Sequence, residues 1–326
     1  MIARGFRLGW AMLLAVGASQ TFAATAWAAF PDKPLRFVVP FPPGGGNDLV
    51  ARSLAEGMSK DLGQQVNVDN RAGGGTVIGT EYVATRPGDG YTILMGSFAF
   101  AVNPSLIKSL PYDPVKSFAP VAYIGSYPNV VVVPPDRPYK TMQEFVAYAK
   151  ANPGKLNYGS FGNGTSPHLS VELLKLLAKV DITHVPYKGA APAITDMLGG
   201  RLDVIFSTVS SAGTYIRSNR LRALAVTSAS RAAAYPDLPT VAEAGVAGYE
   251  AVAWYGILAP AGTPRDIVNR LNASIALAAK SENFLKRSAE DGLEVKIDSP
   301  EVLAKLIDVE IARWRPVVVE NKLKAD

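Results

Sequence analysis

Two glycine-rich segments carry the residue types best suited to holding an anion. Pro42 to Asp48 follows an expected strand and precedes an expected helix, and Phe161 to Pro167 repeats that arrangement later in the chain. Glycine lets the backbone turn sharply and approach a ligand closely, and the free amides at a helix start favour a negative group. Neither segment has the G-K-[ST] of a P-loop or the G-x-G-x-x-G of a dinucleotide site. One such segment is often only a turn, but two at strand-to-helix junctions predict a binding function.

Side chains that could catalyse a reaction are few. The two histidines are His168 and His184, no H-E-x-x-H motif is present, and Ser160 does not lie in a G-x-S-x-G elbow. The S-x-x-K motif at Ser105 lacks the S-D-N and K-T-G motifs that accompany it in β-lactamases. The chain has no cysteine, which excludes thiol nucleophiles, thiolate-bound metals and disulfides. We therefore predict no enzyme activity, no metal and no cofactor, and interpret His168 as a hydrogen-bonding residue at a helix terminus.

The elements that position these segments are expected to alternate between strands and helices. A βαβαβ order is typical of a parallel sheet with helices on both faces. Helix starts are indicated by a capping box from Thr141 to Glu144 and by prolines at Thr263-Pro264 and Ser299-Pro300. Strands are expected at residues 35–39, 66–68, 92–95, 121–124, 130–133, 156–158, 182–187, 202–206, 221–226 and 255–258.

The strand order predicts two lobes rather than two consecutive domains. The tail after Trp254 has too few expected strands to be a domain of its own. The chain is therefore expected to leave one lobe, build a second and return to finish the first. We place lobe 1 at residues 29–127 and 253–326 and lobe 2 at residues 128–252, with crossings near 125–129 and 250–255.

Residues 1–28 have the features of a cleaved secretory signal. Arg4 and Arg7 precede the short apolar stretch Leu8 to Val16, and Ala26-Trp27-Ala28 has the small-x-small pattern of a cleavage site. The stretch is short for a membrane span, although an uncleaved anchor is the alternative. Without a cysteine the exported chain cannot carry an N-terminal lipid. We expect a freely diffusing monomer, and the formal charge of +5 without a basic stripe predicts no nucleic acid partner.

Seven ordered blocks, from about residue 30 to the C-terminus, resemble the Bug-type (TctC-like) receptors of tripartite tricarboxylate transporters. The blocks are Phe41 to Arg52, Asn70 to Gly75, Pro87 to Thr92, Tyr158 to His168, His184 to Gly189, Leu238 to Gly245 and Leu258 to Pro264. The resemblance implies a type II-like periplasmic binding protein, in which two α/β lobes joined by two hinge crossings close over a small organic carboxylate. It also implies delivery of that ligand to the membrane subunits of a tripartite tricarboxylate-type transporter.

The resemblance also implies which residues bind the ligand, largely through backbone groups and bridging water. In this family the two glycine-rich loops hold one carboxylate. The loop positions expected at the site are Pro43, Gly45, Gly46, Asn47, Asp48, Ser160, Gly162, Asn163, Gly164, Thr165 and His168. Residues after other strand ends, expected to line the cleft, are Ser97, Lys188, Phe206, Ser207, Thr208 and Trp254. We expect Asp48 to support its loop by accepting backbone amides, which differs little from a simple helix cap.

Two other functions remain open from the sequence. A sensor that binds the same ligand and signals through a membrane kinase would have the same lobes, and neighbouring kinase genes would indicate it. A periplasmic hydrolase is disfavoured because no nucleophile–base pair is recognisable. The sequence does not specify which carboxylate is bound.

Overall fold

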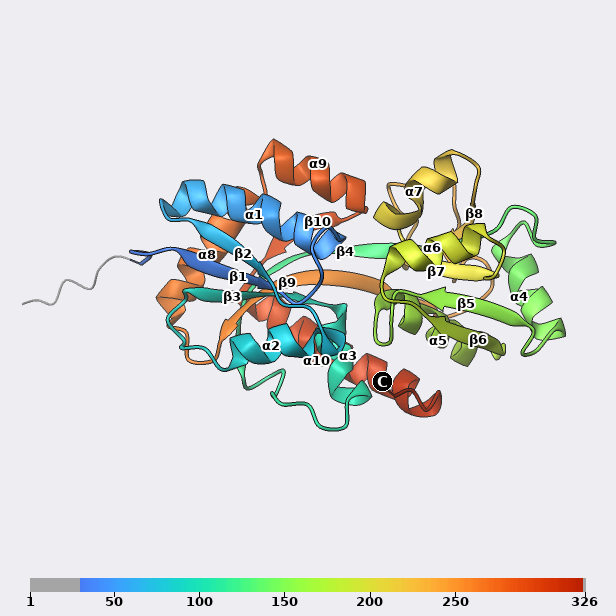
Figure 1. The fold of residues 1–326 in the computed structure, drawn as a ribbon, viewed down its shortest axis with the longest axis horizontal. Helices are drawn as coiled ribbons and strands as arrows, with labels where there is room; N and C mark the ends of the chain where they lie inside the picture. The colour runs from blue at the N-terminus through green and yellow to red at the C-terminus, as the bar shows by residue number, and fades with distance from the viewer. Residues whose placement is uncertain (1–29, 325–326) are drawn as a thin grey trace, which may run out of the picture.

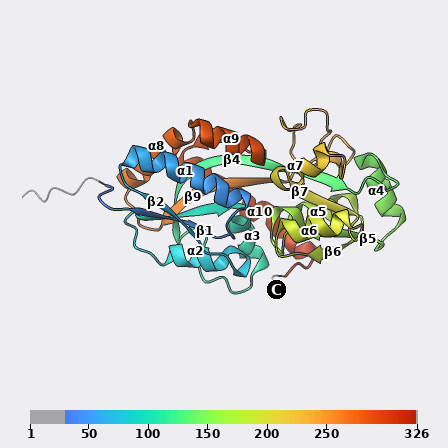
Figure 2. The same ribbon diagram turned by 45° about the horizontal axis from the view of Figure 1, so that its top comes forward.

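Two long strands, β4 (Phe118–Val133) and β9 (Val252–Pro260), connect the two lobes of the protein. The computed structural model describes residues 30–324, so the expected secretory signal lies outside the described residues. Both ribbon views show β4 and β9 passing between the lobes (Figures 1 and 2). Within residues 30–324 no helix is both long enough and apolar enough to cross a membrane.

Lobe 1 has a parallel core of three strands. Strand β1 pairs in parallel with both β2 and β3, and β9 then joins β3 in the antiparallel sense. Helices α1, α8 and α9 cover one face of this sheet, and α2, α3 and α10 cover the other (Figure 1). The elements are β1 (Leu35–Val39), α1 (Gly46–Leu62), β2 (Val66–Asn70), the 3₁₀ helix η1 (Gly74–Thr76), α2 (Val77–Ala84), β3 (Thr92–Ser97), α3 (Phe98–Leu106), α8 (Arg265–Ala278), α9 (Glu282–Asp291), β10 (Glu294–Asp298) and α10 (Pro300–Glu320).

Lobe 2 repeats the parallel arrangement. Strand β5 pairs in parallel with β6 and β7, while β7 and β8 pair antiparallel with β4. Apolar side chains of α4 and α5 pack on one face of this sheet, and those of α6 and α7 pack on the other. The elements are α4 (Met142–Ala151), β5 (Leu156–Ser160), α5 (Ser166–Ala178), β6 (Ile182–Pro186), α6 (Ala190–Leu198), β7 (Val204–Thr208), α7 (Val209–Arg217) and β8 (Arg222–Val226).

All of these strands form one sheet that continues through both lobes. Its order is β2-β1-β3-β9-β4-β7-β5-β6, with β8 and β10 also pairing with β4. Strand β4 pairs with β9 as far as Pro128 and with β7 from Asn129 onward. The carboxyl ends of the parallel strands, and the helix starts that follow them, are therefore directed toward the junction of the lobes, which is where open α/β sheets bind ligands.

Two details of the strands differ from the sequence expectation. The segments 121–124 and 130–133 belong to the single strand β4, because Gly125, with φ of 151°, takes up a register shift within the strand. Strand β10 was not expected, and it pairs antiparallel with β4 near that shift. The lobe boundaries at residues 127/128 and 252/253 stay a prediction.

Candidate functional site

The first glycine-rich loop is held by a buried aspartate. Asp48 is 1% exposed and its carboxylate accepts hydrogen bonds from the Gly44 amide at 2.9 Å, Arg52 Nε at 3.0 Å and Asn70 Nδ2 at 2.9 Å. Burial acts to raise the pKa of Asp48, but the hydrogen bonds from Arg52, Gly44 and Asn70 outweigh it and hold the pKa below its ordinary value. The expected support of the loop by Asp48 is confirmed, with side chains of Arg52 and Asn70 as additional donors.

Helix α1 begins in this loop with amides that have no acceptor. The helix starts at Gly46 with Gly45 as its N-cap, and no side chain caps it. Within residues 30–324 the amides of Gly46 and Asn47 have no hydrogen-bond acceptor, and Asn47 Oδ1 is buried without a partner. A Cβ atom placed on Gly45 would have no atom within 4 Å. The start of α1 is thus an open position with unsatisfied donors, which suits an anion.

The second glycine-rich loop is held by hydrogen bonds within itself and from α5. The Gly162 amide donates to Ser160 Oγ at 3.2 Å, Thr165 Oγ1 donates to the Gly162 carbonyl at 2.7 Å, and the Gly164 amide donates to His168 Nδ1 at 3.1 Å. Helix α5 then begins at Ser166 with Thr165 as its N-cap. Two of the amides expected to face the ligand, those of Gly162 and Gly164, therefore already have acceptors inside the protein.

His168 is a neutral, buried acceptor. It is 2% exposed, and burial, with smaller contributions from His184 and Lys175, lowers the pKa of its ring to about 3. Its ring stacks on that of His184 at a centroid distance of 4.2 Å, and the His184 ring stacks on Tyr158 at 4.7 Å. The interpretation of His168 as a hydrogen-bonding residue at a helix terminus is confirmed, because it fixes the Gly164 amide.

The structure contains one serine–histidine pair that the sequence did not reveal. Ser160 Oγ lies 2.7 Å from His184 Nε2, although the two residues are 24 positions apart. Ser160 has no exposed surface, and its Oγ also contacts both the amide and the carbonyl of Gly162. The pair therefore connects β6 to the second glycine-rich loop, and contact of Ser160 with a ligand stays a prediction.

Gly164 brings the second loop against lobe 1. It has a φ of 76°, and a Cβ atom on it would lie 2.8 Å from Leu106 Cδ2 and 3.8 Å from Asn103 Oδ1, both on α3. Asn103 in turn donates to the carbonyl of Gly75 at 2.9 Å and to Thr76 Oγ1 at 3.1 Å. The positive φ and the close approach both favour glycine at this position.

The other expected residues lie at strand ends but differ in burial. Ser97 ends β3 and is buried, Lys188 follows β6 and is exposed, and Thr208 is half-buried as the N-cap of α7. Phe206 and Ser207 have no exposed surface, and Trp254 packs in the lobe 1 core with Phe100 and Leu303. The Nε1 of Trp254 is buried without a partner. Their contact with a ligand stays a prediction.

Comparison with known proteins identifies the family. The tripartite tricarboxylate transporter family receptor (TctC) matches residues 50–323. The chain belongs to this family. BugT of Bordetella pertussis is 38% identical to the receptor over 297 residues, which are 90% of this chain and 91% of BugT.

Solved structures agree with this assignment. R. palustris Rpa4515 with adipate is 36% identical, with a TM-score of 0.83 over 91% of this chain and 100% of that one. MatC from Rhodopseudomonas palustris with bound malate is 34% identical, with a TM-score of 0.80 over 89% of this chain and 100% of that one. The resemblance to Bug-type receptors and the two-lobed α/β fold are therefore confirmed.

One residue of the receptor's lobe junction was missed from the sequence. Asp291, the last residue of α9, is 5% exposed, and a Cβ atom on Gly46 would lie 2.7 Å from its Oδ1 and 2.8 Å from its Oδ2. An acidic residue at the last turn of a helix is unfavourable for the helix dipole, and this was the signal available in the sequence. The contact itself joins residues 245 positions apart, which no local pattern indicates.

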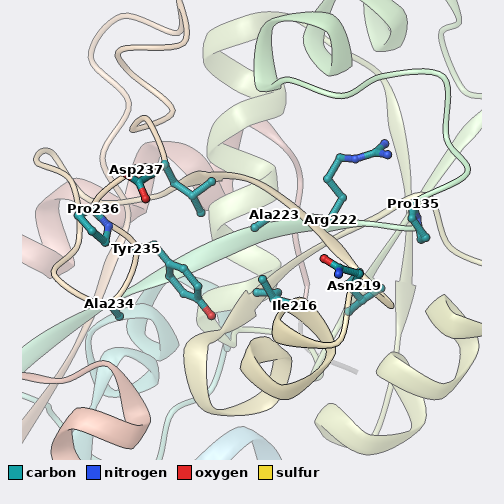
Figure 3. Close-up of a pocket in the computed structure, with 11 residues that line it drawn as sticks. Pro135, Ile216, Asn219, Arg222, Ala223, Ala234, Tyr235, Pro236 and Asp237 are labelled. Atoms are coloured by element: carbon teal, nitrogen blue, oxygen red, sulfur yellow. The ribbon is translucent and has the colours of Figure 1, made fainter.

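A surface hollow on lobe 2 is separate from these residues. Figure 3 shows the side chains of Ile216, Asn219, Arg222 and Tyr235 around it. It includes none of the expected ligand-binding residues. Within the described part of the chain, no cluster of three or more His, Asp or Glu side chains could hold a metal ion.

Proposed function

We propose that this receptor captures a small organic carboxylate between its two lobes in the periplasm and delivers it to the membrane subunits of a tripartite tricarboxylate-type transporter. It acts as a monomeric binding protein and not as an enzyme. In this proposal lobe 1 comprises residues 29–127 and 253–326, lobe 2 comprises residues 128–252, and the crossings near residues 125–129 and 250–255 form the hinge.

The start of α1 is the observation that carries this proposal. Gly46 and Asn47 offer amides without acceptors, Gly45 leaves open space in front of them, and Asn47 Oδ1 is buried without a partner. Buried polar atoms are nearly always hydrogen-bonded in the functional state. A carboxylate with a bridging water supplies both an acceptor for the amides and a donor for Asn47 Oδ1.

The second loop contributes in a different way from the first. Because the amides of Gly162 and Gly164 are already bonded, the groups left for the ligand are the amides of Asn163 and Ser166 at the start of α5. The proposed carboxylate then lies between the starts of α1 and α5, each of which contributes about 0.3–1 kcal/mol of favourable dipole interaction. The solved relatives with adipate and with malate make dicarboxylates the first class to test.

A melting panel tests the proposal. Mono-, di- and tricarboxylates are compared with their fully amidated analogues and with neutral sugars. A ligand at 100 times its dissociation constant stabilises the protein by about 2.7 kcal/mol, which is readily seen as a shift in Tm. At least one acid should raise the Tm while its amide does not, and X-ray scattering should then show a smaller radius of gyration. A shift with sugars and with no acid would contradict the proposal.

A further inference from the structure

Asp291 occupies a position between the lobes that the proposed function does not explain. Its carboxyl group lies beside Gly46 at the start of α1, and the Tyr255 hydroxyl donates to its Oδ2 at 3.0 Å. Helix α9, which ends at Asp291, packs against α7 of lobe 2. Asp291 therefore lies where lobe 1 meets α7 of lobe 2.

The surroundings of Asp291 bring the lobes together. The next residue, Gly292, lies so close to α7 that a Cβ atom on it would be 2.8 Å from Val209 Cγ2. Figure 1 shows the end of α9 beside α7. On the crossing strands, the rings of Tyr127 and Tyr255 pack at a centroid distance of 4.8 Å. Because α7 is the element of lobe 2 that packs at this end of α9, we expect the carboxyl group to become more exposed when α7 separates from α9.

The groups that face this carboxyl group are uncharged. Within residues 30–324 they are the hydroxyl groups of Tyr255 on β9 and Tyr127 on β4, together with the amide end of α1 at Gly46. Burial raises the pKa of Asp291, and nearby hydroxyl groups such as that of Tyr255 offset that effect only in part. An ionised carboxylate without a cationic partner is costly to bury.

We propose that Asp291 is a protonation-dependent latch between the lobes, which favours their closed arrangement when it holds a proton and opposes it when ionised. When protonated, it is a neutral group that stays buried beside α7 with its hydrogen bond from Tyr255. When ionised, it places a second negative charge beside Gly46, where the proposed ligand would bind its own carboxylate. Closure of the receptor around an anion is then coupled to uptake of one proton. The last step rests on the proposed function, but the latch itself does not.

The direction of the pH dependence follows from the raised pKa. Separation of α7 from α9 returns the carboxyl group to water, where its pKa approaches the ordinary value of 3.8. Below about pH 3.8 the carboxyl group is protonated in both the closed and the open arrangement, so its charge does not oppose closure. As the pH rises toward the higher pKa of the closed arrangement, the open arrangement loses its proton first and becomes favoured. One proton changes the closed-to-open ratio by at most about tenfold per pH unit.

Fluorescence energy transfer in the ligand-free protein tests the latch. The chain has no cysteine, so dyes can be attached through L277C on α8 of lobe 1 and Y148C on α4 of lobe 2, both at exposed positions. Between about pH 8 and pH 4.5 the transfer efficiency of the otherwise wild-type protein should report a rising closed fraction. D291N keeps the shape of the side chain and its capacity for hydrogen bonds but removes the charge. At every pH it should therefore show the closed fraction that the otherwise wild-type protein reaches at acidic pH.

Matched variants separate the latch from general effects of pH. E290Q removes the exposed carboxylate next to Asp291 and should follow the wild type at every pH. V209A removes the methyl groups of lobe 2 that lie against Gly292 and should lower the closed-to-open ratio at every pH, a result that is informative even if D291N does not fold. A flat wild-type curve, or the same pH dependence in wild type and D291N, would overturn the latch. Because no ligand is present, that result would leave the carboxylate proposal to the melting panel.

Discussion

The proposed anion position predicts that a single methyl group at Gly45 impairs binding without harming the fold. Gly45 has φ of −86° and ψ of 169°, which alanine adopts without strain, and an added Cβ would contact nothing within 4 Å. As an N-cap, alanine lowers the free energy of unfolding by several tenths of a kcal/mol relative to glycine. Alanine also has less conformational freedom than glycine in the unfolded chain, which raises the free energy of unfolding by about 0.4–1 kcal/mol. The free energy of unfolding of Gly45→Ala should therefore stay within about 0.5 kcal/mol of the wild type.

The expected effect on binding is much larger. In the proposed site the added methyl group occupies the open space beside Gly45 and should keep a carboxylate oxygen from reaching hydrogen-bond distance of the Gly46 amide. Loss of one hydrogen bond to a charged group costs about 1.5–3 kcal/mol, or roughly a 10- to 150-fold weaker affinity. With ligand at 100 times the wild-type dissociation constant, a variant with 100-fold weaker binding gains only about 0.4 kcal/mol, against about 2.7 kcal/mol for the wild type.

Differential scanning fluorimetry measures this difference directly. At roughly 2–4 °C per kcal/mol, the wild type should shift by roughly 5–10 °C and Gly45→Ala by about 1 °C. Gly199→Ala is the matched control, because Gly199 has φ of −82° and only ordinary contacts around an added Cβ, at the end of α6. An equal ligand-induced shift in Gly45→Ala and wild type would refute the placement of the carboxylate at the start of α1.

Three further predictions concern the loops and export. Asp48→Ala removes the acceptor shared by the Gly44 amide, Arg52 and Asn70 and should lower the free energy of unfolding by about 1.5–3 kcal/mol in urea at pH 7. Since the folded pKa of Asp48 is lowered, its contribution is present above about pH 4 and should fade below it in the wild type, with the variant losing less. Gly164→Val should abolish the ligand-induced melting shift, because the valine side chain would meet Leu106 of lobe 1. The positive φ at this position should also lower the Tm of the variant without ligand. Normal ligand binding by the variant would contradict this prediction. Intact-mass analysis of the exported protein should show cleavage after Ala28, and a form that retains Met1 would contradict the expected signal.

The alternation of strands and helices could be predicted because local patterns determine it. Gly-rich loops at Pro42 to Asp48 and Phe161 to Pro167 mark strand-to-helix junctions in both lobes, and the structure places α1 and α5 there. The continuity of β4 was missed because Gly125 to Pro128 has the composition of a turn. Its strand conformation depends on pairing with β9 and β10, which lie more than 120 residues away along the chain.

The site was predictable only as far as its own loops. Asp48 lies four residues from Gly44 and Arg52, so its support of the loop follows from local spacing. The hydrogen bond from the Gly162 amide to Ser160 Oγ, by contrast, depends on the conformation of the loop, which glycine content alone does not indicate. Asp291 reaches Gly46 only after the chain has completed lobe 2 and returned, so a single sequence without an alignment cannot indicate the contact.

The position of β9 has a consequence for how the chain folds. Strand β9 lies between β3 and β4 in the finished sheet, although all of lobe 2 is synthesised before it. The elements of lobe 2 from α4 to β8 follow one another without interruption, whereas the edge of β3 that pairs with β9 lacks its partner until the last quarter of the chain is made. Unpaired strand edges invite pairing with other chains, and long-range pairing is slow. We therefore expect lobe 1 to be the more aggregation-prone part of the incomplete chain, and a chain truncated before β9 should contain a folded lobe 2 and an unfolded remainder.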